Sequence, residues 1–173
     1  MATSPPAGVA ARIDRSVVAT GLTYPALVEA FERELGRWDS SVGARLVERN
    51  AVWSEVEREV EGLAGPHGLM IFFRIDQGLV VSLAGVPRRC SLYLVGNPVI
   101  AQRILSVDVR ASLYVPFRVA IYDEGGPDGA VIAYDRPSSF LAALGHVELA
   151  ELGALLDRKV EAVVAAIGRI TPR

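Results

Sequence analysis

The chain has 173 residues, 51% of them hydrophobic, and its 18 basic and 20 acidic residues give a net charge of −2. This length suits a single domain with a full core. The balanced charge leaves no basic field for a phosphate backbone, so we expect no nucleic-acid partner. The high apolar share indicates either an extensive core or an apolar subunit interface.

A single cysteine, Cys90, excludes an internal disulfide bond and a zinc cluster built on cysteines. No apolar run approaches the roughly 20 residues of a membrane span. Residues 1–8 lack the basic-then-apolar layout of a signal peptide. We therefore interpret residues 1–12 as a disordered tail and residues 13–170 as one domain, and we expect a cytoplasmic protein with no membrane partner.

The sequence of the first third of the domain predicts one strand followed by two helices. The strand covers residues 15–21, and Thr23 is the candidate N-cap of the first helix. The second helix is expected from about residue 44 to residue 63, where Gly65-Pro66 ends it. Both helices have apolar residues at helical spacing, and these are Leu27, Phe31, Leu35 and Trp38 in the first and Trp53, Val56, Val60 and Leu63 in the second.

The rest of the chain predicts four strands and three helices. The strands cover residues 68–75, 90–95, 114–122 and 130–134, the last two joined by the glycine-rich turn 125–129. Residues 76–85 suit either a short helix or a strand. One helix begins at Asn97-Pro98 and another at Pro137. The last helix has a continuous apolar stripe, formed by Leu149, Leu152, Leu156, Val160, Val163 and Ile167.

These elements do not alternate strictly, and the hairpin favours antiparallel pairing. The sequence therefore predicts an α+β fold in which helices cover one face of an antiparallel sheet.

Several short motifs occur in an order that resembles the bacterial family known as domain of unknown function 302. They are Ile75-Asp76-Gln77, Gly96-Asn97-Pro98, Val115-Pro116-Phe117-Arg118, Asp123-Glu124 and Tyr134-Asp135-Arg136-Pro137. The resemblance covers roughly residues 69–144. It implies a TBP-like α+β fold that is often dimeric, with no agreed activity.

Two features depart from the pattern of that family. Gln77 stands where relatives often have a histidine, and the helix expected at 44–63 is an addition to the usual short connection. Any chemistry that the histidine carries in relatives would be missing from this chain.

The candidate ligand-binding residues are Arg118, Tyr122, Tyr93, Asn97 and Asp76. Arg118 and Tyr122 share one face of a strand by period two, and an arginine beside a tyrosine can grip a carboxylate. A solvated outer face gives the same pattern. Asn97 begins a helix whose free N–H groups favour negative charge, although Asn and Pro are the ordinary residues of a helix start and a plain start is the favoured interpretation.

Asp76 has two interpretations. With Asp135 and Glu124 it could form an acid–base cluster or a weak metal site, but aspartate at strand ends ordinarily caps backbone groups. His67 and His146 belong to no ligand motif, so we expect no bound metal and no cofactor.

Three functions remain open. The leading hypothesis is a module that binds a small apolar or carboxylated organic ligand. The second is a cofactor-free isomerase, cyclase or hydrolase that uses the same cavity. The third is a structural protein whose added helix forms an oligomer interface. In each case the apolar composition predicts a homodimer or larger assembly.

Overall fold

The computed structural model describes residues 11–169, so all but the last two residues of the expected tail lie outside the described part. The strands are β1 (Arg15–Ala19), β2 (Gly36–Arg37), β3 (Met70–Asp76), β4 (Arg89–Gly96), β5 (Phe117–Asp123) and β6 (Val131–Asp135). The α-helices are α1 (Tyr24–Arg33), α2 (Ser40–Glu48), α3 (Trp53–Leu63), α4 (Gln77–Val81), α5 (Pro98–Val107), α6 (Pro137–Leu141) and α7 (Val147–Gly168). Short 3₁₀ helices are η1 (Ser82–Ala84), η2 (Val109–Leu113) and η3 (Ala142–Leu144).

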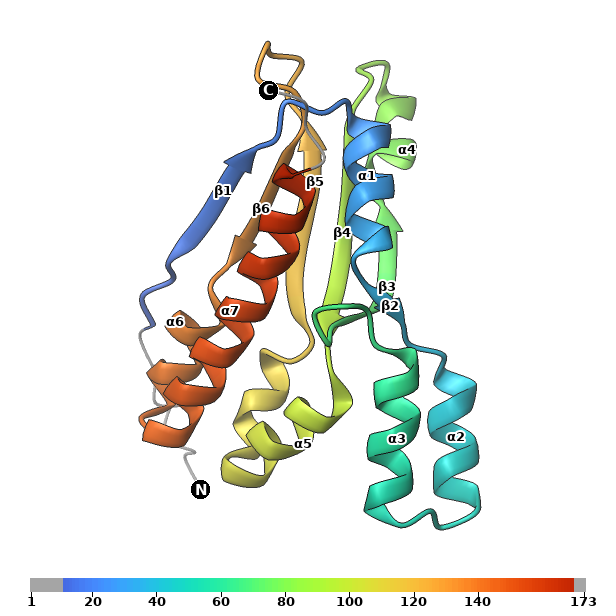
Figure 1. Cartoon of the computed structure of the whole chain (residues 1–173). Helices are drawn as coiled ribbons and strands as arrows, with labels where there is room; N and C mark the ends of the chain where they lie inside the picture. The colour runs from blue at the N-terminus through green and yellow to red at the C-terminus, as the bar shows by residue number, and fades with distance from the viewer. Residues whose placement is uncertain (1–10, 170–173) are drawn as a thin grey trace, which may run out of the picture.

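The six strands form one sheet in the order β1-β6-β5-β4-β3-β2. All neighbours pair antiparallel except β2 and β3, which are parallel. The long helices α1 and α7 lie on one face of the sheet and leave the other face open (Figure 1). The predicted α+β class is confirmed, and the short parallel edge strand β2 is one feature that the sequence did not predict.

The core lies between the sheet and the helices α1 and α7. Residues of β5 alternate, so that Val119 and Ile121 are fully buried under the helices while Arg118 faces the open side. The whole predicted apolar stripe of α7 is buried, from Leu149 to Ile167. None of the helices in the described part is long and apolar enough to cross a membrane.

The segment predicted as one helix at 44–63 is a hairpin of two helices. Asp39 caps α2 by accepting a hydrogen bond from the Ser41 backbone N–H at 2.8 Å. The chain then turns at Asn50, whose φ of 48° lies in the left-handed region that asparagine tolerates. Figure 1 shows α2 and α3 side by side beyond the end of β2. The prediction of a single helix was wrong: the apolar positions that indicated it, from Trp53 to Leu63, all lie in α3, and the residues before the turn form the separate helix α2.

Two further boundaries differ from the sequence prediction. Residues 77–84, which suited either element, are helical and form α4 and η1. The strand expected from residue 114 begins at Phe117, because η2 occupies residues 109–113 just before it.

Candidate functional site

A pocket of about 470 Å³ opens on the uncovered face of the sheet, where β5 begins. Arg118 lines it, and we call it the Arg118 pocket. Apolar side chains form most of its walls, from β4, η2 and α6, and polar ones complete it. The full lining is Ile13, Leu94, Ser112, Leu113, Tyr114, Val115, Pro116, Phe117, Arg118, Asp135 and Phe140.

Local structure explains how this pocket forms. Arg118 and Leu94 are register partners on adjacent strands, so both side chains project from the same face. Leu113, at the end of η2, is 80% exposed and forms part of the rim. Tyr114 stacks on Phe140 with ring centroids 5.1 Å apart, which joins η2 to α6 and fixes the far wall.

The electrostatics of the pocket favour an anion. Asp135 lines it too, but Arg15 already holds that carboxylate, with its Nε 2.7 Å and its Nη2 3.3 Å from the two oxygens. Within residues 11–169, Arg118 makes no ion pair with any acidic side chain. An exposed guanidinium next to apolar walls can bind a carboxylate through two parallel hydrogen bonds.

Tyr122 shares the open face with Arg118, as predicted, but it does not line the pocket. The two residues are four apart on β5, which separates their Cα atoms by roughly 13 Å in an extended strand. Tyr122 therefore belongs to the same surface without being part of the cavity.

Tyr93 lies on the opposite face of the sheet, so its predicted place beside Arg118 was wrong. It is fully buried under α1, and its hydroxyl donates to Glu32 Oε1 at 3.0 Å. Burial raises the pKa of the Tyr93 hydroxyl, and the nearby Glu32 carboxylate raises it further. The Arg74 guanidinium lies 5.6 Å from the ring centroid.

Glu32 is the centre of this cluster, which extends from the buried Tyr93 ring to two arginines at the surface. Besides the tyrosine it accepts a hydrogen bond from Arg74 Nη1 at 2.9 Å and another from Arg37. Arg74 therefore pairs with an acid of α1 and not with Asp76, its neighbour in sequence. The cluster joins α1 to β2, β3 and β4, and it lines none of the cavities described here, so we assign it a structural role.

Asn97 and Asp76 cap helices, which was the plainer of the two interpretations for each. Asn97 Oδ1 accepts from the backbone N–H groups of Val99 and Ile100 at 2.8 and 3.2 Å. Its Nδ2 donates to the Gly68 carbonyl at 2.9 Å. Asp76 accepts from the Leu79 N–H at 3.2 Å. The helix donors that would attract an anion at Asn97 are thus already partly satisfied.

Of the five predicted site residues, only Arg118 lines the Arg118 pocket. The sequence analysis missed Leu94, Leu113, Tyr114 and Phe140, which form its walls. Successive side chains of a strand point to opposite faces, so the sequence could place Leu94 and Tyr93 on different faces of the strand at 90–95. The strand register that sets Leu94 beside Arg118 has no sequence signal.

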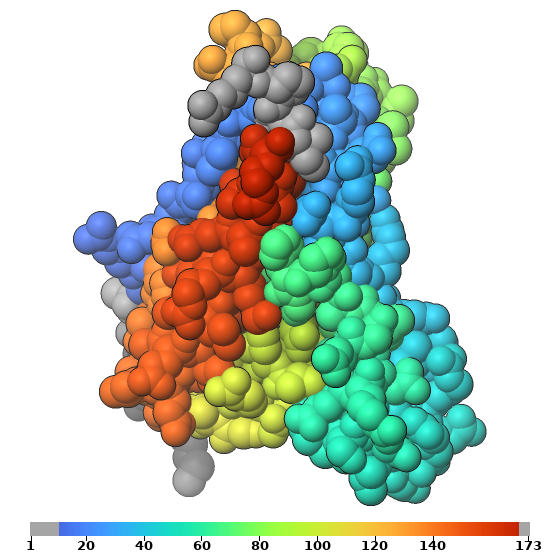
Figure 2. Space-filling view, viewed as in Figure 1, coloured from blue at the N-terminus to red at the C-terminus, as the bar shows by residue number. Residues whose placement is uncertain are grey.

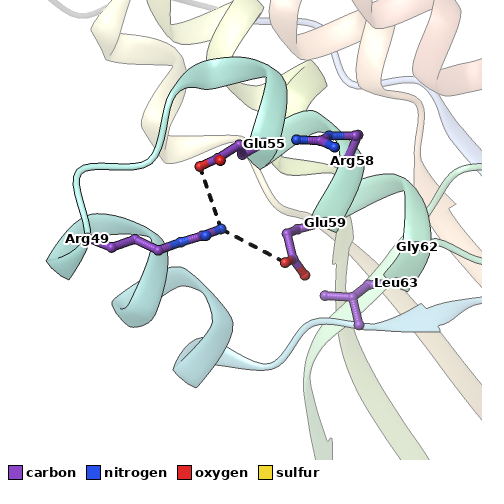
Figure 3. Close-up of a pocket in the computed structure, with 6 residues that line it drawn as sticks. All are labelled: Arg49, Glu55, Arg58, Glu59, Gly62 and Leu63. Atoms are coloured by element: carbon purple, nitrogen blue, oxygen red, sulfur yellow. Dashed lines mark ion pairs between the residues drawn. The ribbon is translucent and has the colours of Figure 1, made fainter.

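Two polar surface clusters are alternative candidate sites. Figure 3 shows a depression between α2 and α3, where the Arg49 Nη2 atom lies 3.8 Å from Glu55 and 4.0 Å from Glu59. Its charges compensate one another at these distances. Among residues 11–169, no three His, Cys, Asp or Glu side chains are placed to hold a metal ion.

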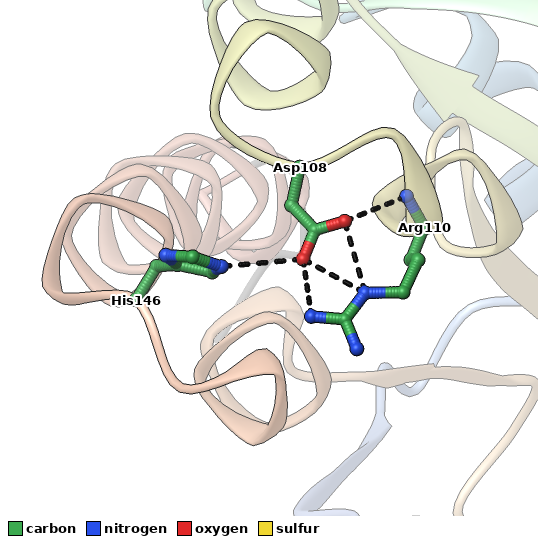
Figure 4. Close-up of polar contacts among 3 residues, drawn as sticks. All are labelled: Asp108, Arg110 and His146. Carbon is green, nitrogen blue, oxygen red and sulfur yellow. Dashed lines mark hydrogen bonds and ion pairs between the residues drawn. The ribbon is translucent and has the colours of Figure 1, made fainter.

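The second cluster is the triad of Asp108, Arg110 and His146 (Figure 4). Asp108 accepts from Arg110 Nη2 at 2.6 Å, and His146 Nε2 lies 3.2 Å from the same carboxylate oxygen. Hydrogen bonds from Arg110 hold the pKa of Asp108 well below its ordinary value. The triad links the start of η2 to the turn before α7, which is a structural role.

Comparison with known proteins identifies the family. The model of the domain of unknown function DUF302 matches residues 47–167, more than half of the chain. The chain belongs to the DUF302 family. The matched region contains β3 to β6 and most of α7, and thus nearly all of the walls of the Arg118 pocket.

The fold agrees with this membership. The crystal structure of an uncharacterized conserved DUF302 protein from Bacillus stearothermophilus superposes with a TM-score of 0.62 at 13% sequence identity. The match covers 88% of this chain and 97% of that one. At this identity the likeness concerns the DUF302 fold alone, and the TBP-like classification stays a prediction. No curated protein matches the chain.

Proposed function

We propose that this DUF302 protein binds a small organic carboxylate in the Arg118 pocket. The observation that carries the proposal is an arginine with no ion pair in residues 11–169, set into a cavity whose walls are mostly apolar. The carboxylate pairs with Arg118, and the apolar body of the ligand lies against Leu94, Leu113 and Pro116. A volume of about 470 Å³ lies within the roughly 300–1,000 Å³ of small-molecule sites.

The charge pattern favours an anionic ligand over a cationic one. A cationic ligand would have to displace Arg15 from Asp135 and tolerate Arg118 as a neighbour of like charge. A neutral ligand would gain no ion pair from the guanidinium of Arg118, which would keep its contacts with water. A carboxylate satisfies Arg118 without breaking an existing ion pair.

An enzymatic function gains no support from this pocket. Asp135 is the one carboxylate that lines it, and Arg15 already contacts both of its oxygens. A general base needs an oxygen free to take a proton from the substrate. The proposal is therefore a binding function.

Nuclear magnetic resonance with octanoate as the probe tests the proposal. We expect saturable shifts of the backbone amides of Leu94, Leu113 and Phe140. Arg118→Ala should lower the affinity for octanoate by about tenfold, or about 1.5 kcal/mol. This is the low end for a hydrogen bond to a charged group, because Arg118 is exposed. Arg103→Ala removes an exposed arginine from α5, outside the Arg118 pocket, and should leave the affinity unchanged. Equal affinities in all three proteins would refute the assignment of Arg118.

We also propose that two copies associate through the α4–η1 segment, defined as residues 77–87. It exposes Leu79, Val80 and Leu83 by 70%, 72% and 86%, and it contains no charged residue. An uncharged apolar surface can face an identical copy of itself without repulsion, as a two-fold interface requires. The Arg118 pocket lies at the other end of β4 and β5, so it stays open in this arrangement.

A further inference from the structure

A second cavity, of about 370 Å³, lies on the other side of the Val115–Pro116 segment, between α3, α5 and the end of the sheet. We call it the tryptophan pocket because both tryptophans of the chain, Trp38 and Trp53, line it. In Figure 2, α5 lies between α7 and the α3 region, and residues of all three helices contribute to this cavity.

Specific features of the backbone produce this cavity. The pairing of β3 with β4 shifts register between Ile71 and Phe73, which makes Phe72 the extra residue of a β-bulge. The bulge turns Phe72 toward Trp38, and the two rings stack with centroids 5.8 Å apart. Bulges often redirect a side chain in this way next to a binding site.

Gly96 keeps the floor of the cavity open. A Cβ atom at this position would lie 3.5 Å from Phe72 Cε2 and 3.3 Å from Pro116 Cβ. Any larger side chain would therefore occupy the space between these two walls. The bulge and the glycine together maintain a cavity where close packing would otherwise be the rule.

The polar side chains of the cavity are few, and three of them already make hydrogen bonds within the protein. No charged side chain lines it. Asn97 is occupied in capping α5, Trp53 Nε1 donates to Glu57 at 3.0 Å, and Gln102 Nε2 donates to Ser106 at 2.9 Å. A ligand with a charge would lose its hydration here without gaining a counter-ion.

We propose that the tryptophan pocket binds a neutral, flat, aromatic or polycyclic molecule, independently of the Arg118 pocket. Four aromatic side chains, those of Trp38, Trp53, Phe72 and Phe117, line the cavity and offer ring faces and edges for stacking. The absence of a charged lining side chain selects against anions and cations. This second site differs from the carboxylate site in both wall chemistry and charge.

The neutral dye N-phenyl-1-naphthylamine is a suitable probe, because it accepts excitation energy from tryptophan and both tryptophans line the cavity. Titration should quench the tryptophan emission to saturation and raise the dye emission. Ala101→Phe fills the cavity from α5. It should lower the affinity for the dye by about tenfold or more, because a close-packed site has no room for a ligand. Ala165→Phe places the same ring on an exposed position of α7 and should have no effect.

Arg118→Ala should also leave the dye affinity unchanged, while it weakens octanoate. Loss of dye binding in Arg118→Ala would overturn the proposal, because the dye would then occupy the Arg118 pocket. So would an unquenched wild type, or equal binding by Ala101→Phe. If Ala101→Phe fails to fold, the indole N–H resonances of Trp38 and Trp53 in the wild type decide: both should shift with the dye, and two unmoved signals refute the site.

Discussion

At the scale of single residues, the cluster around Glu32 predicts how two substitutions change the stability of the protein. Glu32→Ala leaves the buried Tyr93 hydroxyl and two arginines without their acceptor, so we expect a loss of about 2–3 kcal/mol in the free energy of unfolding. Tyr93→Phe removes the donor and its need for a partner together, and should cost about 1 kcal/mol.

Urea denaturation measures both changes. Glu29→Ala is the matched control, because Glu29 lies on the same helix and its ion pair with Arg33 is exposed. It should change stability by less than about 0.5 kcal/mol. A smaller loss for Glu32→Ala than for Tyr93→Phe would contradict the structural role of the cluster.

Asp108 gives a prediction about pH. Hydrogen bonds from Arg110 lower the pKa of its carboxyl below the ordinary value of 3.8, so the folded state binds this proton less readily than the unfolded state. Its contribution to stability is therefore complete above pH 3.8 and declines as the pH falls toward the lowered pKa. Carbon-detected titration should place the midpoint of Asp108 below 3.8, and Arg110→Ala should raise it. A midpoint at or above 3.8 in the wild type would contradict the geometry of Figure 4.

Arg118 and Tyr93 show which parts of the candidate site could be predicted from the sequence. Period two correctly separated Arg118 from its buried neighbours in β5. The face of Tyr93 depends on the antiparallel register, in which Tyr93 is opposite the buried Val119. A shift of one residue would reverse that face, and no local pattern fixes the register between distant strands.

At the scale of elements, the hairpin of α2 and α3 is held by a close approach of two glycines to the backbone. A Cβ atom on Gly36 would lie 1.8 Å from the Leu63 carbonyl oxygen, and one on Gly65 would lie 2.6 Å from the Gly36 nitrogen. Both Gly36 and Gly65 donate their N–H groups to the Leu69 carbonyl at 3.0 Å. These contacts fix the end of α3 against β2.

Gly36→Ala should therefore destabilise the protein by about 1–3 kcal/mol, the usual cost of overpacking. Gly62→Ala is its counterpart, because Gly62 lies within α3 with open space at the Cβ position. Alanine there should stabilise the protein by about 0.5–1 kcal/mol through helix propensity. Thermal denaturation of the two variants should show shifts of opposite sign, and shifts of equal sign would refute this packing.

The elements that the sequence predicted well are those with strong periodicity or clear caps, such as α7 and the Asn97 start of α5. The turn between α2 and α3 has one local signal, Asn50, and the apolar positions that indicated a helix from residue 44 all lie after that turn, in α3. The strand β2 has two residues and no pattern of its own, since tertiary pairing with β3 alone creates it.

At the scale of the whole molecule, the apolar composition predicted an assembly built on the added helix and Trp53. In the structure Trp53 lines a cavity, and the most exposed apolar side chains of the α4–η1 segment are more exposed than Trp53. We expect a dimer mass by light scattering at micromolar concentration. Leu79→Glu with Leu83→Glu should give a monomer with unchanged circular dichroism, because buried like charges repel across a two-fold interface. A monomeric wild type would refute the dimer, and a variant that stays dimeric would place its interface elsewhere.

The central claim, a carboxylate bound by Arg118, is tested most directly by comparing octanoate with 1-octanol on wild type and Arg118→Ala by calorimetry. The two ligands share an apolar chain and differ in the charged head. Wild type should prefer octanoate by about tenfold, the value of one charge-assisted hydrogen bond at an exposed site. Arg118→Ala should bind the two ligands equally well. The same preference in both proteins, or none in the wild type, would contradict the proposed function.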